Sequence, residues 1–136
     1  MVFSAMESKR KHFSSGAPWE SIAGYSRAVQ IGPHVWVSGT TAVEAGEVVH
    51  PGDAAGQCQF IITKIQSVLE AAGLDLASVV RTRMFVVEAA DAEAVMQVHG
   101  RLFGDIQPAA TLVIVKALVN PELLVEIEVD AYQEKS

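Results

Sequence analysis

The stretch that decides the fold is the last third of the chain, which contains Pro108–Val115 (PAATLVIV) and then Val125–Ala131 (VEIEVDA). In the second segment, branched apolar residues at odd positions alternate with three acids at even positions. A period of two is typical of a strand with one buried face. Three acids on one face are costly unless water, cations or another subunit receive them. The segment therefore predicts a strand with one face on a core and the other facing water or a second subunit.

The size and hydropathy of the chain predict one domain that associates with copies of itself. We expect its 136 residues to form a single domain, 1–136, in which 1–22 is a partly irregular N-terminal arm. Half of the residues are hydrophobic and the mean hydropathy is +0.28. The apolar runs are shorter than the roughly 20 residues of a membrane span, so no membrane partner is expected. The apolar excess must be buried in the core or between subunits, which favours an oligomer.

Charge and cysteine content narrow the possible partners and the compartment. A net charge of -6 without a lysine or arginine cluster argues against nucleic acid as a partner. Cys58 is the single cysteine, so no internal disulfide can form, and the N-terminus lacks a secretory signal pattern. Both features predict a cytoplasmic protein. The four histidines stand far apart in the sequence, so we expect neither a metal site nor a cofactor.

The rest of the chain alternates strand and helix patterns. Asp53 is expected to be the N-cap of a helix that ends at Gly73. Asp91 is expected to cap a second helix, which Gly104 closes. This order predicts an α+β fold, a mixed β-sheet with two helices packed on one face. The expected elements are strands at 25–31, 35–38 and 79–87, helices at 53–73 and 91–104, and two strands in the last third separated by a turn at 120–121.

Several short motifs, in this order, resemble those of the Rid/YjgF family of reactive intermediate deaminases, also named endoribonuclease L-PSP. The matching segments are Gly24–Ala28 (GYSRA), Val37–Thr40 (VSGT), Gln57 with the helix to Gly73, Val80–Arg83 (VRTR) and Pro108–Ala131. The resemblance implies a chorismate-mutase-like fold assembled as a homotrimer. Three sheets would form a central barrel with small-molecule pockets at the subunit boundaries. Active members of the family hydrolyse reactive enamines and imines.

The resemblance also implies which residues line the pocket. Tyr25, Ser38, Gly39 and Thr40 match ligand-binding positions. Glu126 matches a glutamate that handles water or a proton, and it is the candidate catalytic residue.

Two positions depart from the active members. In them an arginine two residues after the signature Pro108 binds the substrate carboxylate through two parallel hydrogen bonds. That position is Ala110 here, and Leu112 stands where many relatives have a cysteine. We expect Ala110 and Leu112 to be among the residues that line the ligand pocket. The chain therefore resembles a branch of the family that lacks this arginine.

Arg81 and Arg83 share one face of a strand and allow two interpretations. They could bind an anionic ligand, with Arg83 as the better candidate for a substitute anchor. They could also form an ion-pair ladder with the acids of the last strand, and the ladder is favoured. Elsewhere, Cys58 is expected to be buried and inert, and Gln57 and His99 are expected at the surface or at helix ends.

These observations lead to one main function and two alternatives. The main hypothesis is a trimeric Rid-like protein that binds a small metabolite and hydrolyses an enamine or imine to a carbonyl compound and ammonia. Glu126 would orient water, and backbone N–H groups at Gly39 and Thr40 would stabilise developing charge. The alternative is a non-catalytic ligand-binding or protein-interaction module that has lost deaminase activity. An endoribonuclease is disfavoured by the acidic charge and by the lack of a basic, aromatic-lined groove.

Overall fold

The computed structural model describes residues 10–134, so residues 1–9 of the expected arm lie outside the described residues. The strands are β1 (Lys11–Phe13), β2 (Ala28–Ile31), β3 (His34–Thr41), β4 (Val43–Glu44), β5 (Glu47–Val48), β6 (Val79–Val86), β7 (Ala109–Ile114) and β8 (Val125–Tyr132). The helices are α2 (Pro18–Ala23), α3 (Ala54–Ala71) and α4 (Ala92–Phe103), with 3-10 turns at Leu76–Ser78 and Ala89–Asp91.

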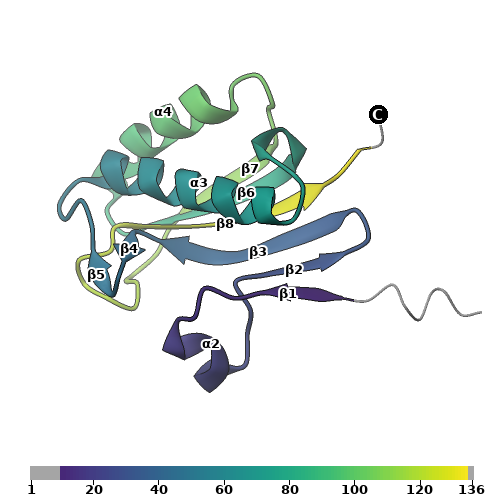
Figure 1. Ribbon diagram of the computed structural model, residues 1–136. Coiled ribbons are helices and arrows are strands. Elements are labelled where there is room, and N and C mark those ends of the chain that lie inside the picture. Colours follow the sequence, from purple (N-terminus) through teal and green to yellow (C-terminus); the bar gives the residue numbers. More distant parts are fainter. Residues whose placement is uncertain (1–9, 135–136) are drawn as a thin grey trace, which may run out of the picture.

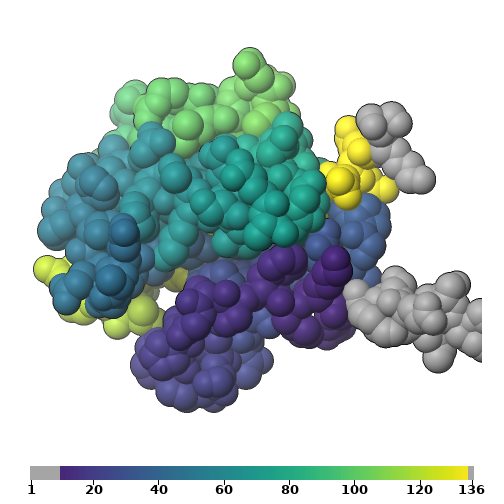
Figure 2. Space-filling model, in the orientation of Figure 1, coloured from purple at the N-terminus to yellow at the C-terminus, as the bar shows by residue number. Residues whose placement is uncertain are grey.

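A six-stranded mixed sheet in the order β1-β2-β3-β8-β6-β7 forms the body of the domain. β6 and β7 are parallel, whereas the other neighbours in this sheet are antiparallel. The long helices α3 and α4 both lie on one face (Figure 1), which confirms the predicted α+β fold. The strand β1 and the helix α2 fall within the arm that was expected to be partly irregular. Figure 2 shows α2 projecting from the body, beside the edge of the sheet.

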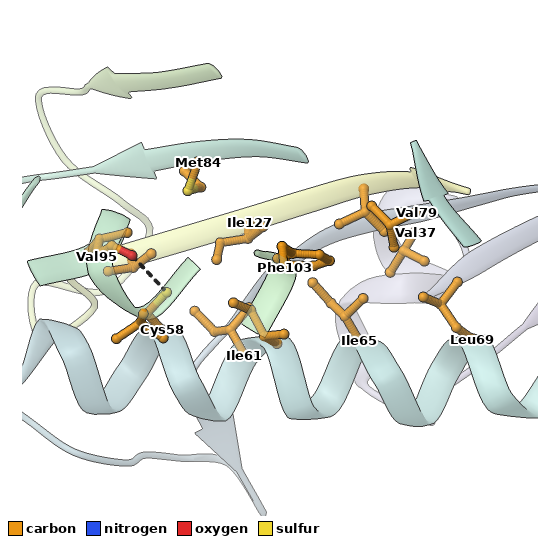
Figure 3. Packing of buried hydrophobic residues seen from close by; sticks show 14 of the residues in the cluster. Val37, Cys58, Ile61, Ile65, Leu69, Val79, Met84, Val95, Phe103 and Ile127 are labelled. Carbon is orange, nitrogen blue, oxygen red and sulfur yellow. Dashed lines mark hydrogen bonds between the residues drawn. The ribbon is translucent and has the colours of Figure 1, made fainter. Parts of the chain in front are cut away.

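The core lies between this sheet and the two long helices. The apolar face of the sheet and the apolar faces of the helices cover each other there. β8 turns Val125, Ile127, Val129 and Ala131 toward the helices, and each of them is at most 3% exposed. α3 contributes buried apolar side chains at helical spacing to the same core: Cys58, Ile61, Ile62, Ile65 and Leu69. Figure 3 shows Phe103 of α4 above Ile61 and Ile65, and Cys58 beside Val95. The thiol of Cys58 is buried, as expected, and burial raises its pKa to about 12.

The helix ends and turns follow the predictions in all but one place. The Asp53 side chain accepts a hydrogen bond from the backbone N–H of Gly56 at 2.9 Å, and Asn120 accepts one from the N–H of Glu122 at 2.8 Å in the expected turn. Asp91 is at the N-cap position of α4, as predicted, but its side chain makes no capping hydrogen bond. Asp91 ends a 3-10 turn and has helical backbone angles, whereas an N-cap needs an extended backbone.

Gln57 lies in the first turn of α3, but it is neither a surface residue nor a capping residue, so the expectation of a surface or capping residue is wrong. Its side chain is fully buried, and its amide joins α3 to the segment before β8. Gln57 donates to the carbonyl of Glu122 at 3.0 Å and accepts from the N–H of Leu124 at 2.8 Å. An amide suits this place because it can donate and accept at once. None of the helices between residues 10 and 134 is long and apolar enough to cross a membrane.

We expect Ile65→Ala to lower the free energy of unfolding by roughly 2–5 kcal/mol, because a buried side chain would leave a cavity. Ile65 is 1% exposed at the middle of α3. Urea unfolding at a fixed protein concentration measures the change. Val119→Ala is the control, since Val119 is 94% exposed and its truncation opens no cavity. Equal unfolding midpoints for the two variants would contradict this account of the core.

Candidate functional site

An irregularity in β3 marks the candidate site. The register between β3 and β8 shifts between Val37 and Thr40, so Ser38 and Gly39 lie in a bulge. Ser38 is tied to the neighbouring strand region, because its N–H donates to the carbonyl of Arg27 at 3.0 Å and its hydroxyl donates to the carbonyl of Ser26 at 2.7 Å. Bulges re-aim side chains and are frequent beside active sites.

The carboxyl group of Glu126 lies directly over Gly39. A Cβ added at Gly39 would come closer to the Glu126 carboxylate oxygen than non-bonded atoms can approach, so a glycine is required for this placement. Burial raises the pKa of the Glu126 carboxyl above its usual value. The positive charge of Arg27 opposes this shift, and the negative charge of Glu128 adds to it. A partly buried carboxyl with a raised pKa is suited to proton transfer.

Arg27 converges on the same glycine from the other side. Its Nη2 donates to the carbonyl oxygen of Gly39 at 2.5 Å, and its guanidinium carbon lies 6.0 Å from the centroid of the Tyr25 ring. Sequence reasoning missed this residue. The signal that could have found it was the alternation from 25 to 31, which places Arg27 and Tyr25 on one face of a strand that pairs with the glycine-bearing strand. The site therefore contains Tyr25, Arg27, Ser38, Gly39 and Glu126.

Comparisons with known proteins agree with this fold. The family model described as Endoribonuclease L-PSP matches residues 15–133. A solved structure from Mycobacterium tuberculosis, a member of the YjgF/YER057c/UK114 family, is 45% identical with a TM-score of 0.83, covering 91% of this chain and 99% of that chain. An uncharacterized protein of Streptomyces coelicolor is 36% identical over 90% of this chain and 92% of its own length. This chain belongs to the Rid/YjgF family.

A further relative carries a name that states an activity. The 3-aminoacrylate deaminase RutC of Acinetobacter baylyi is 36% identical over 107 residues, which cover 78% of this chain and 84% of that protein.

The expected ligand-binding positions Ala110 and Leu112 lie elsewhere in the sheet. Ala110 and Leu112 pair with Thr82 and Met84 across the β6–β7 ladder, at the edge of the sheet opposite β1. Two strands, β8 and β6, separate β7 from the bulge in β3. One chain therefore does not bring Ala110 and Leu112 together with Gly39 and Glu126.

Two other candidates point away from Gly39. Thr40 pairs with Ile127 on the helix-covered side and is 2% exposed, so its side chain is buried. Arg83 donates to Glu128 at 3.2 Å and to Asp130 at 3.4 Å, as the expected ladder requires. Arg81 does not join this ladder, because its guanidinium donates to the hydroxyl of Thr111 at 3.4 Å.

His99 lies on the helix side, where its ring hydrogen-bonds the hydroxyl of Thr82 at 2.9 Å. It is half-buried rather than at the surface, and burial lowers the pKa of its imidazole. A hollow of about 300 Å³ between Gly73 and Gln133 is far from Glu126 in the sheet.

We expect Gly39→Ala to push the Glu126 carboxyl toward solvent and so to lower its pKa toward the usual value. Gly39 is not among the residues with a positive φ, so alanine fits the backbone and the effect is confined to the side-chain contact. A carboxyl-carbon NMR titration measures the pKa. Gly100→Ala is the control, because an added Cβ there meets nothing within 4 Å. A raised Glu126 pKa that persists in Gly39→Ala would contradict the proposed contact.

Proposed function

We propose that this chain hydrolyses small enamines or imines to a carbonyl compound and ammonia. The observation that carries the proposal is the Glu126 carboxyl, held over Gly39 with a raised pKa on the sheet face that α3 and α4 do not cover. The name of the Acinetobacter baylyi relative, a deaminase of 3-aminoacrylate, supports the same chemistry.

The reaction needs one group that can take and return a proton. An enamine first becomes an imine when its β-carbon is protonated and its C=C electrons shift to form C=N. Water then attacks the imine carbon and gives up a proton to the Glu126 carboxylate, while the nitrogen is protonated. The resulting carbinolamine loses ammonia as the C–N bond breaks and the C=O bond forms. Glu126 fits this role because a base with a pKa nearer neutrality transfers protons in both directions.

We also propose a homotrimer with pockets between subunits. Its support is the separation of Ala110 and Leu112 on β7 from Gly39 and Glu126, since a neighbouring copy could join these two sets. Exposed apolar side chains on the open face of the sheet also favour association. They include Trp36 (42% exposed), Val113 (42%) and Tyr132 (40%).

We expect light scattering to give three times the chain mass across a dilution series. Val113→Glu should shift the molecules toward monomers, because it places a charge in the proposed interface. The control is Val119→Glu, which changes an equally apolar residue that is 94% exposed. A wild-type monomer at high micromolar concentration would contradict the trimer.

A non-catalytic binding module is the second candidate, and Ala110 favours it because this position lacks the family's arginine. An RNA substrate has little support, since the net charge is -6. We also propose that the protein is cytoplasmic, needs no cofactor, and has neither a nucleic-acid nor a membrane partner.

We expect ammonia release from imines generated from amino acids to fall by about 100-fold or more in Glu126→Gln, since the proton acceptor is lost. Glu126 must be ionised to accept a proton from water. The wild-type rate should therefore fall as the pH drops through the Glu126 pKa, which lies above the usual value of 4.5. Glu88→Gln, an exposed change of the same kind, is the control. Equal wild-type and Glu126→Gln rates would contradict the proposed base, and a wild type without ammonia release would favour the binding module.

A further inference from the structure

We propose that Arg27 is the carboxylate anchor of this site, in place of the arginine that position 110 lacks. The inference rests on the proposed function, and it names the residue that selects substrates carrying a carboxylate. The proposal is supported by the position of the Arg27 guanidinium, which lies at the site and forms no ion pair with a carboxylate of residues 10–134.

Arg27 has unused hydrogen-bonding capacity. A guanidinium has five N–H donors, and the structure gives Arg27 one side-chain bond, from Nη2 to the carbonyl of Gly39. Its Nε is buried and has no partner. Within residues 10–134 no carboxylate oxygen lies within 4 Å of its nitrogens. A half-buried arginine without a carboxylate partner is uncommon, because such charges are usually paired.

The acidic residues near Arg27 do not form ion pairs with it. Glu20 feels its charge, but the Glu20 carboxylate already accepts hydrogen bonds from the hydroxyls of Ser14 at 2.7 Å and Ser15 at 2.5 Å. Glu126 also feels its charge, but it lies over Gly39 beyond ion-pair distance. The ammonium group of Lys64 donates to the carbonyl of Val43 at 2.8 Å and adds a second positive charge to this region. The local field therefore favours a small anion.

Arg83, the other candidate anchor, differs from Arg27 because it is already paired with carboxylates. Its Nη1 is shared between Glu128 and Asp130, so its charge is already compensated by two carboxylates. A ligand that bound Arg83 would have to compete with both. Arg27 offers its charge without that competition, beside the carboxyl that the proposed reaction uses.

The position of Arg27 suits a substrate with the carboxylate next to the reacting carbon. Arg27 and Glu126 both contact Gly39, one at its carbonyl and the other over its Cα. A short 2-imino acid could place its carboxylate on the guanidinium and its C=N carbon near Glu126. We therefore assign specificity for small 2-imino acids to Arg27.

The test is a comparison of two probes that differ only in charge, 2-oxopropanoate and 2-oxopropanamide. Arg27→Gln should weaken binding of 2-oxopropanoate by about 10- to 100-fold, as expected for loss of a charge-assisted hydrogen bond, and change binding of the amide by less than about 2-fold. Glutamine is shorter than arginine and does not reach as far as Nη2, so the melting temperature of each variant is measured to show that it is folded. Arg101→Gln is the control, because it removes a positive charge from the exposed face of α4.

Calorimetric titration with both probes decides the matter without an activity readout. The proposal is overturned if Arg27→Gln weakens both probes equally or neither, if the wild type does not prefer the acid, or if Arg83→Gln removes the preference while Arg27→Gln keeps it. Ammonia release from 2-iminopropanoate is measured in parallel. Release by the wild type with no role for Arg27 would reject the anchor alone, whereas acid binding that needs Arg27 without release would reject the hydrolase alone.

Discussion

The antiparallel pairing of β8 with both β3 and β6 is the constraint on which the rest of the structure depends. β8 lies in the middle of the sheet, and every second side chain enters the core while the acids between them face the open side. A shift of one residue would bury three carboxylates and expose the apolar set, so the register is strongly determined. This register places Glu128 and Asp130 beside Arg83 and carries Glu126 to the bulge in β3.

The bulge converts this regular sheet into a local site. In a regular ladder the side chains opposite Glu126 would alternate without converging on it. The irregularity at Ser38 and Gly39 brings a residue without a side chain under the carboxyl, and it exposes the Gly39 carbonyl to Arg27 from the neighbouring strand region. As a result, the carboxyl of Glu126 on β8 and the guanidinium of Arg27, just before β2, both lie against Gly39, an arrangement that one strand alone could not provide.

The same sheet topology separates the two sets of residues that the proposed intersubunit pocket would join. The site on β2, β3 and β8 and the altered positions Ala110 and Leu112 on β7 lie in different parts of one sheet. Ala110 carries no charge that could bind an anion on its side of the proposed intersubunit pocket. In our proposal, Arg27 would bind the anion from the other side.

The periodicity of apolar residues and the helix-end signals in the sequence alone determined the fold class, the two long helices and the alternation of β8. These features depend on interactions between residues close in the chain, or on which face of a helix or strand is buried and which is exposed to solvent. Tertiary structure alone decided the roles of Gln57, Asp91 and Arg27. Gln57 is buried because a distant segment needs both a donor and an acceptor, and Asp91 fails as a cap because a 3-10 turn precedes it. Arg27 could be placed on a face from its spacing, but its unpaired charge depends on which acids the other strands bring near, and those contacts join residues far apart in sequence.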